Sequence, residues 1–326
     1  MMRAVGYRRL GPAAEVLHLE IRPIPEAPGA GEVIIRLHAS GINPHDTKAR
    51  AGWTGGTPPE DFFIPHSDGA GVVTAVGAGV DLAIGARVWV FGAPHGAGTA
   101  ADYLRIPAWR VLPLPDALDF AEGASLGVPL LTAWLAVLAD GPVMDQVLLV
   151  QGGGGAVGEA AVALGVAFGA RVVATARSAD SAARAAARGA LAVRAPDDPA
   201  LSQFIADMTG GAGVPRVVEV DFGANQTRNL AMLADHGTLA SYSATSDKFP
   251  TLDYYGFARK GARISFVQGM KLTPAHIVRA RADLLPLLAQ GQLRPTIAAR
   301  FALDEAAAAH EMVERGAGGN VVLMLN

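Results

Sequence analysis

The chain has 326 residues, of which 51% are apolar, with a formal net charge of −3 and no cysteine. Its length favours two domains, because single hydrophobic cores stop growing at about 250–300 residues. The net charge of −3 shows no excess of basic residues that would favour binding to nucleic acid or to an anionic membrane. The lack of cysteine excludes disulfides, thiolate nucleophiles and thiolate-bound zinc. No apolar stretch reaches transmembrane length and no signal core precedes the first strand pattern, so we expect a cytoplasmic protein.

The first 121 residues are predicted to form a mostly β unit that is partly barrel-like. Short strand patterns recur at even spacing and are separated by Gly and Pro, which is typical of such units. The strand patterns are RAVGY, EVLHLEIR, GEVIIRLHASGI, GAGVVTAVG, GARVWVF and ADYLRI.

From Phe120 the pattern changes to helices and then to alternating strands and helices. Six apolar strands with helices between them predict a doubly wound parallel sheet. These strands are QVLLV, ARVVATA, ALAVRA, RVVEV, GTLASYS and ARISFVQ, and the helices between them include 156–168 and NQTRNLAMLAD. Later helices are predicted over 274–290, with Thr273 as N-cap, and over 305–315. The last strand, VVLML, is expected to rejoin the first unit, so the predicted domains are 1–121 completed by 269–326, and 122–268.

A glycine turn joins the strand QVLLV to the next helix. Gly153, Gly155 and Gly158 give the G-x-G-x-x-G spacing, in which the glycines allow a tight turn, backbone approach to a diphosphate and close packing of helix on strand. The helix start adds free N–H groups and a positive dipole end. Because strand, turn and helix follow in the required order, we interpret the motif as a dinucleotide site rather than a structural glycine turn.

The end of the second strand of this sheet favours NADPH over NADH. NAD enzymes usually place an acidic residue there for the ribose 2′-hydroxyl, whereas this chain reads Thr175-Ala176-Arg177-Ser178. A guanidinium and a hydroxyl suit a 2′-phosphate. The alternative is that Arg177 is a solvated surface charge and Ser178 only the N-cap of the next helix.

Four motifs in order resemble the medium-chain dehydrogenase/reductase superfamily, and within it the zinc-free quinone oxidoreductases, the zeta-crystallin-like branch. The motifs are GINPHDTKARAG (41–52), PHSDGAGVVTAVG (65–77), VPLLTAWLAV (128–137) and QGGGGAVG (151–158). The resemblance extends nearly end to end. It implies a six-stranded Rossmann domain inserted in a GroES-like catalytic domain, and a homodimer.

The resemblance also implies catalysis without zinc. The zinc alcohol dehydrogenases of this superfamily use Cys, His and Cys ligands at positions that match Asn43, Ser67 and Val128, none of which is a competent zinc ligand. His45, His66 and Asp68 are expected near one another in this site, but their spacing matches no known zinc site. We therefore expect no metal. The other histidines, His310 among them, are predicted to be surface or packing residues.

Without a metal, the chemistry that suits NADPH is hydride transfer to a quinone or an α,β-unsaturated carbonyl, and the oxygen that gains charge then needs a hydrogen-bond donor. Asn43 matches the asparagine of the family motif G-V-N-P and is the first candidate, although Asn before Pro is also common turn chemistry. Lys48 stands at the position where familiar quinone reductases carry tyrosine. A lysine at this position resembles the enone reductases of the family. It is a candidate proton donor or a solvated charge, and His45 is a second candidate.

Further contacts are implied by the resemblance and by the fold, since ligands lie at the carboxyl ends of the strands. The expected cofactor residues are Thr132, Gly153, Gly155, Ala156, Val157, Gly158, Thr175, Arg177, Ser178, Ser241, Tyr242, Phe266, Val267, Gln268 and Asn320. The expected substrate residues are Asn43, Lys48, Trp53, Tyr254 and Tyr255. The alternatives to an NADPH-dependent reductase are a nucleotide-binding protein with a structural or redox-sensing role and, less favoured, an alcohol dehydrogenase.

Overall fold

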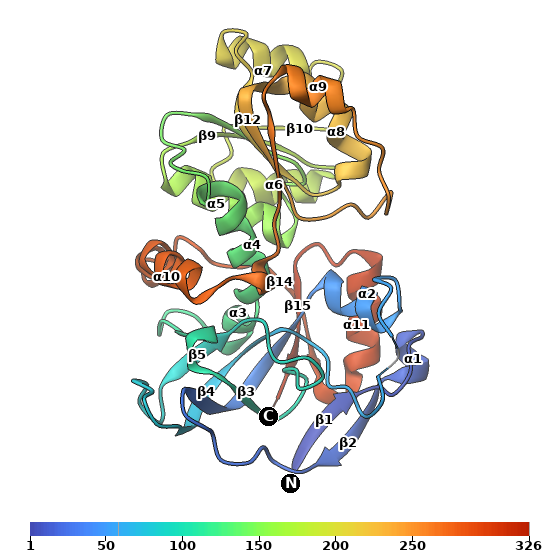
Figure 1. Cartoon of the computed structure of the whole chain (residues 1–326), viewed down its shortest axis with the longest axis vertical. Coiled ribbons are helices and arrows are strands. Elements are labelled where there is room, and N and C mark those ends of the chain that lie inside the picture. The colour runs from blue at the N-terminus through green and yellow to red at the C-terminus, as the bar shows by residue number, and fades with distance from the viewer. Residues whose placement is uncertain (58, 326) are drawn as a thin grey trace. The chain divides into compact units, whose positions relative to one another are not determined.

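The computed structural model describes residues 1–57 and 59–325. The chain divides into two compact units (Figure 1): unit 1 comprises 1–128 and 270–326, and unit 2 comprises 129–269. The sequence pattern puts the first boundary at 121, but the helix α3 (Phe120–Ala124) packs on strands of unit 1.

Unit 1 is built on a seven-stranded sheet in the order β14-β15-β3-β4-β5-β7, with β6 also paired to β3, and on a separate β1–β2 hairpin. The last strand, β15, pairs antiparallel with β3 from Val321↔Ile42 to Met324↔Ala39, which confirms that the C-terminal strand rejoins the first unit. The strands of unit 1 are β1 (Met2–Gly6), β2 (His18–Arg22), β3 (Glu32–Ile42), β4 (Asp68–Val76), β5 (Arg87–Val90), β6 (Tyr103–Pro107), β7 (Val111–Pro113), β14 (Ile297–Ala302) and β15 (Asn320–Met324).

The helices of unit 1 are short except for the two near the C-terminus. Thr273 caps α10 by accepting a hydrogen bond from the His276 backbone N–H, as its position before Pro274 predicts. The helix α11 packs against α1 and α2. The helices are α1 (Ala13–Val16), α2 (Pro44–Arg50), α3, α10 (Pro274–Ala289) and α11 (Ala306–Arg315), with 3-10 turns at Ala108–Arg110 and Leu303–Glu305. The 3-10 turn Gly269–Lys271 and α4 (Gly127–Leu138) each span a boundary between the units.

Unit 2 is a six-stranded parallel sheet in the order β10-β9-β8-β11-β12-β13, flanked by helices (Figure 1). This order confirms the doubly wound fold, because the strands run 3-2-1-4-5-6 and the order reverses between β8 and β11, where such folds bind ligands. The strands are β8 (Val147–Val150), β9 (Arg171–Thr175), β10 (Ala192–Arg194), β11 (Val214–Glu219), β12 (Leu233–Ser241) and β13 (Arg263–Phe266). The helices are α5 (Ala156–Ala167), α6 (Ala179–Ala187), α7 (Leu201–Thr209), α8 (Phe222–Met232) and α9 (Tyr254–Arg259).

One element boundary in unit 2 differs from the sequence prediction. The helix predicted over NQTRNLAMLAD ends at Met232, and β12 begins at Leu233, four residues before the predicted strand. Leu233 is buried and pairs with Val214 of β11. Pairing with the neighbouring strand therefore outweighs the helical pattern of this segment.

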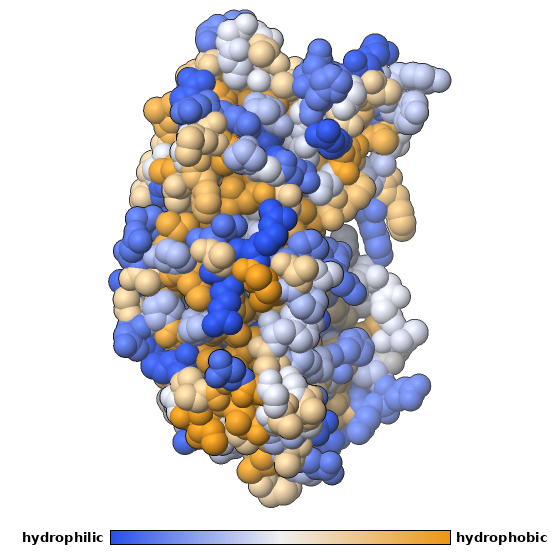
Figure 2. Space-filling model, turned by 60° about the vertical axis from the view of Figure 1, so that its left-hand side comes forward, coloured by the Kyte–Doolittle hydropathy of each residue, from blue (hydrophilic) through white to orange (hydrophobic). Residues whose placement is uncertain are grey.

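The two units have separate apolar cores, one around β3, β4 and β15 and one around β8, β11 and β12. In the described residues, no helix has both the length and the apolar character needed to cross a membrane. On the face drawn in Figure 2, apolar and polar residues are interspersed.

Candidate functional site

The glycine turn lies between β8 and α5, and each of its glycines has its own role. The left-handed residue is Gly152 (φ 71°) rather than Gly153, whose missing side chain lets the turn pack on Ala174. A Cβ on Gly158 would lie 2.1 Å from the Gly152 carbonyl oxygen, so only glycine lets α5 pack this closely. Gly155 is exposed, and a Cβ there would touch nothing closer than 3.5 Å. The backbone at the start of α5 is therefore open to a ligand.

The first turn of α5 contains Ala156 and Val157, both expected to contact a cofactor. Their N–H groups lie in the first helical turn, where backbone donors have no partner within the helix. Free donors and the positive end of the helix dipole make this turn suited to an anion.

The residues at the end of β9 have different surroundings. Thr175 is 1% exposed; its hydroxyl donates to Gln151 Oε1 (2.6 Å) and accepts from the Gly152 N–H (3.1 Å). Arg177 and Ser178 are exposed, and Ser178 caps α6 by accepting from the Ser181 N–H (3.2 Å). Arg177 forms no ion pair with any residue that the structure describes. Thr175 thus supports the turn, while Arg177 is accessible to a ligand.

The other cofactor candidates of unit 2 lie in the middle of α4 and at the ends of β12 and β13. Thr132 Oγ1 accepts from the Gly269 N–H (3.2 Å), and the Val267 N–H donates to the Ser241 carbonyl (2.8 Å). Phe266 is 76% exposed. The bond between Val267 and Ser241 joins the ends of β12 and β13, and the bond between Gly269 and Thr132 joins the segment after β13 to α4. Tyr242 follows Ser241, and Gln268 follows Val267.

Asn320 lies in unit 1, whereas the other predicted cofactor residues lie in unit 2. It is the first residue of β15, and both its backbone N–H and its side-chain Nδ2 donate to the Thr296 carbonyl (2.8 and 3.0 Å). Asn320 therefore holds Thr296, the residue before β14, against the start of β15.

Asn43 and Asp68 form a buried pair in unit 1. Asn43 precedes α2 and is 6% exposed; its Nδ2 donates to Asp68 Oδ2 (2.8 Å), and its backbone N–H donates to Asp46 (2.8 Å). Asp68 Oδ2 also accepts from the Val128 N–H (2.7 Å). The amide of Asn43 is thereby oriented, and its second N–H remains available, since each amide nitrogen carries two hydrogens.

Burial changes the pKa of both carboxyl groups beside Asn43. Burial raises the pKa of Asp68 to about 8, with a further contribution from the like charge of Asp46 and an opposing one from its hydrogen bonds. Burial raises the pKa of Asp46 to about 7. Asp68 therefore carries its proton at neutral pH.

Lys48 and Trp53 lie together at the end of α2, with the Lys48 ammonium 4.8 Å from the centre of the Trp53 ring. Desolvation, together with the charges of Lys48 and Lys271, lowers the pKa of His45. The candidate catalytic residues of unit 1 thus lie at the N-cap of one short helix (Asn43) and within it (His45 and Lys48), and the substrate candidate Trp53 follows the helix. The two remaining substrate candidates, Tyr254 and Tyr255, are exposed in unit 2 with their rings 5.3 Å apart.

The residues at the positions of zinc ligands in zinc alcohol dehydrogenases have other contacts. Asn43 and Val128 both donate to Asp68, and the Ser67 carbonyl accepts from Ala93. Across residues 1–57 and 59–325, no three His, Cys, Asp or Glu side chains are grouped so as to hold a metal ion.

His66 belongs to a buried hydrogen-bonded chain that the sequence did not predict. His66 Nε2 lies 2.8 Å from His310 Nε2, and His66 Nδ1 lies 2.8 Å from Ser40 Oγ. Ser40 Oγ lies 2.7 Å from Thr99 Oγ1, which donates to the Asp68 carbonyl (2.6 Å). His310 is 244 residues away in sequence, so no local pattern could indicate this contact.

Counting protons fixes the direction of this chain. A carbonyl only accepts, so the Thr99 hydroxyl donates to the backbone carbonyl of Asp68, and the Ser40 hydroxyl donates to Thr99 Oγ1. His66 then donates from Nδ1 to Ser40 Oγ, and His310 donates from Nε2 to His66 Nε2. Burial lowers the pKa of His66 to about 3, and burial with nearby His66 and Arg50 lowers that of His310. Both imidazoles are neutral at pH 7.

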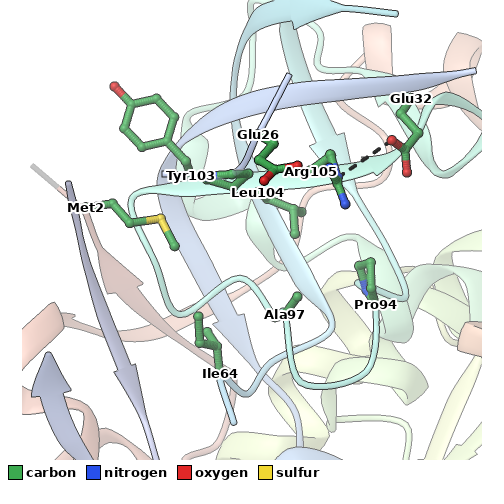
Figure 3. A pocket seen from close by; sticks show the side chains of 11 residues that line it. Met2, Glu26, Glu32, Ile64, Pro94, Ala97, Tyr103, Leu104 and Arg105 are labelled. Atoms are coloured by element: carbon green, nitrogen blue, oxygen red, sulfur yellow. Dashed lines mark ion pairs between the residues drawn. The ribbon is translucent and has the colours of Figure 1, made fainter. Parts of the chain in front are cut away.

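A separate cavity of about 340 Å³ lies elsewhere in unit 1 (Figure 3). Met2, Ile64 and Leu104 contribute its apolar wall, and Arg105 pairs with Glu32 (3.6 Å) at its rim. It includes none of the predicted site residues.

Comparison with known proteins gives matches over the whole chain. Residues 29–116 match the family described as "Alcohol dehydrogenase GroES-like domain" and residues 189–323 the family described as "Zinc-binding dehydrogenase". The quinone oxidoreductase of Sus scrofa is 30% identical over 329 residues, which cover 100% of this chain and 98% of that protein. The quinone oxidoreductase of Homo sapiens is 29% identical over 329 residues, which also cover 100% of this chain and 98% of that protein.

Solved structures of quinone oxidoreductases are also similar to this chain. A mycobacterial quinone oxidoreductase is 29% identical with a TM-score of 0.87, and a mycobacterial protein solved in complex with NADPH is 26% identical with a TM-score of 0.86; each comparison covers 100% of both chains. The chain belongs to the medium-chain dehydrogenase/reductase superfamily, in its quinone oxidoreductase branch.

Proposed function

We propose that this protein is an NADPH-dependent reductase that transfers hydride to a quinone or an α,β-unsaturated carbonyl without zinc. The observation that carries the proposal is the glycine turn into α5, whose exposed Gly155 leaves the helix start open to a diphosphate. The NADPH complex of the mycobacterial relative supports the choice of cofactor.

The surroundings of the turn fit NADPH. Arg177 is exposed just beyond the end of β9, where the adenosine ribose lies in this fold, and its guanidinium suits a 2′-phosphate. When bound, NADPH supplies the hydride. Ala156, Val157 and Arg177 bind its phosphates.

The polar groups of unit 1 suit a conjugated acceptor. Hydride addition to the electrophilic carbon moves an electron pair onto the carbonyl oxygen. Asn43 stabilises this oxygen with the N–H that it does not donate to Asp68. A proton from Lys48 or His45 completes the reduction. Trp53, Tyr254 and Tyr255 offer aromatic faces to a flat acceptor.

The contacts at the zinc-ligand positions support a metal-independent reaction. Asn43, Ser67 and Val128 provide no imidazole or thiolate, and catalytic zinc requires three protein ligands. Elemental analysis of the purified protein is expected to find no stoichiometric zinc. Full activity after dialysis against a chelator is the second expected result.

Stopped-flow mixing of the protein and NADPH with a panel of quinones and enones tests the proposal. We expect acceptor-dependent loss of the NADPH absorbance. If no member of the panel accelerates NADPH oxidation although NADPH binds tightly, the reductase assignment is wrong and the nucleotide-binding role without turnover replaces it. We also propose a homodimer, as in the family, which light scattering in solution tests.

A further inference from the structure

A line of buried hydrogen bonds runs beneath the glycine turn of unit 2. The Gly152 N–H donates to Thr175 Oγ1 (3.1 Å), and Thr175 donates to Gln151 Oε1 (2.6 Å). Gln151 Nε2 donates to Asn229 Oδ1 (2.7 Å), and Asn229 Nδ2 donates to Glu219 Oε2. The line therefore joins the ends of β9, β8 and β11 to the helix α8.

Every bond in this line points the same way and ends on a carboxylate. Donors and acceptors that are aligned in this manner polarise one another. The second oxygen of Glu219, Oε1, accepts from Asn225 Nδ2 (2.9 Å) and from the Asp221 N–H. Both carboxylate oxygens are therefore used as acceptors, and the direction of the line cannot reverse.

The side chains of the line are almost completely buried. Gln151 is 2% exposed, and Asn229 and Glu219 are 0% exposed. Burying polar groups is costly even when they are paired, and apolar side chains of the same size would pack as well. What the polar groups add is a fixed position for the Gly152 N–H. Gly152 has a positive φ, and its position sets the path of the backbone to Gly155.

We propose that Gln151, Asn229 and Glu219 are positioning residues that hold the turn 152–155 in the conformation that receives the nucleotide diphosphate. The inference rests on the proposed function, because the ligand of the turn is taken to be NADPH. These residues act through Thr175 and Gly152 and do not touch the nucleotide. They determine affinity for the diphosphate, which NADPH and NADH share.

The first test uses the variants Gln151→Met and Asn229→Leu, which keep the volume but remove the hydrogen bonds. Fluorescence titration of the folded proteins is expected to give a Kd for NADPH about tenfold above that of the wild type, with the NADPH to NADH preference unchanged. We expect kcat at saturating NADPH to stay within about twofold. Gln203→Met is the matched control, because Gln203 pairs with Asp207 on the exposed face of α7.

A charge swap separates positioning from simple stability. Asn229→Asp alone places two carboxylates together and is expected to weaken NADPH binding or the fold. Adding Glu219→Gln restores every bond, because the new amide nitrogen at position 219 donates to the new carboxylate at position 229. The amide oxygen at position 219 still accepts from Asn225. The double variant is expected to recover the wild-type Kd within about twofold.

The outcomes distinguish the inference from the proposed function. A wild type that binds neither NADPH nor NADH overturns the proposed function itself. A wild type that binds NADPH, with Q151M and N229L folded and binding equally well, overturns only the inference. A lower melting temperature with an unchanged Kd does the same, because it shows that the line stabilises the fold and does not position the turn.

Discussion

At Asp68 the two carboxyl oxygens have different surroundings. Oδ2 accepts from Asn43 and from the Val128 N–H, whereas the buried Oδ1 has no hydrogen-bond partner among the described residues. Because burial raises the pKa of this group to about 8, the carboxyl group is protonated at neutral pH and loses its proton in alkaline solution. A buried negative charge then forms beside the amide that is proposed to stabilise the substrate oxygen.

The variant Asp68→Asn cannot form this charge but keeps an acceptor for Asn43. We expect the kcat of the wild type to change near pH 8 and that of D68N not to change there, while the two values at pH 7 agree within about threefold. Asp68→Leu removes the acceptor and is expected to lower kcat by about tenfold or more. Steady-state rates from about pH 6 to 9.5 measure both. An unchanged alkaline profile in D68N would show that Asp68 does not control Asn43.

His66 makes the stability of the fold depend on pH. Its folded pKa of about 3 lies below the unfolded value of about 6.5, so its contribution is complete above pH 6.5 and is lost as the pH falls toward 3. His66→Asn removes the titration, and Asn tolerates the positive φ of 76° at this position. Between pH 7 and 5, we expect the wild type to lose roughly 2 kcal/mol more unfolding free energy than H66N.

Urea unfolding of the two proteins at both pH values measures this difference. Asp46 and Asp68 have raised pKa values, and their contributions therefore fall as the pH rises, which is the opposite sign. They are present in both proteins and largely cancel in the comparison. Equal pH dependence in the wild type and H66N would contradict neutral burial of His66.

At the scale of elements, the junction between β9 and α6 is expected to select the nucleotide. Arg177→Ala removes the exposed guanidinium proposed to bind the 2′-phosphate. We expect KM for NADPH to rise about tenfold and KM for NADH to change by less than about twofold. Arg171→Ala, at the exposed opposite end of β9, is the control. A parallel rise for both nucleotides in R177A would show that Arg177 does not read the phosphate.

The sequence predicts these elements well where one local pattern decides them. Six apolar strands separated by helices are recognised because the chain must alternate between sheet and helix, and Thr273 marks the start of α10. The prediction is wrong at the end of α8, where Leu233 leaves a helical pattern to pair with Val214. A contact between strands carries no signal in the local sequence.

The candidate site also contains residues that a local pattern predicts and residues that it does not. The glycine motif and Arg177 can be recognised because spacing alone indicates their chemistry. The contacts of His66 with His310 and of Gln151 with Asn229 cannot, because the partners are distant in sequence and each residue type is common elsewhere. The pattern at the end of β9 indicates a cofactor residue at Thr175, and it carries no sign that the buried hydroxyl supports the turn.

At the scale of the whole molecule, the proposed function assigns the nucleotide phosphates to residues of unit 2 and the reduction of the acceptor to polar groups of unit 1. The glycine turn and α5 belong to unit 2, whereas Asn43 and Lys48 belong to unit 1. A ligand that binds only the folded state stabilises it by ~2.7 kcal/mol at a hundred times its Kd. If Asn43 and Lys48 act on the acceptor, a complex that holds both the nucleotide and an acceptor analogue must show slower amide exchange in both units.

Hydrogen exchange of the free protein and of its complex with NADP and an unreactive acceptor analogue tests this expectation. We expect slower exchange in 151–158 and in 43–53, and little change in the β1–β2 hairpin, which contains none of the candidate residues. Slower exchange in 151–158 alone would keep the nucleotide site and remove Asn43 and Lys48 from the reaction. The acceptor would then have to be sought beside the aromatic residues of unit 2, since a hydride can move only between groups in contact.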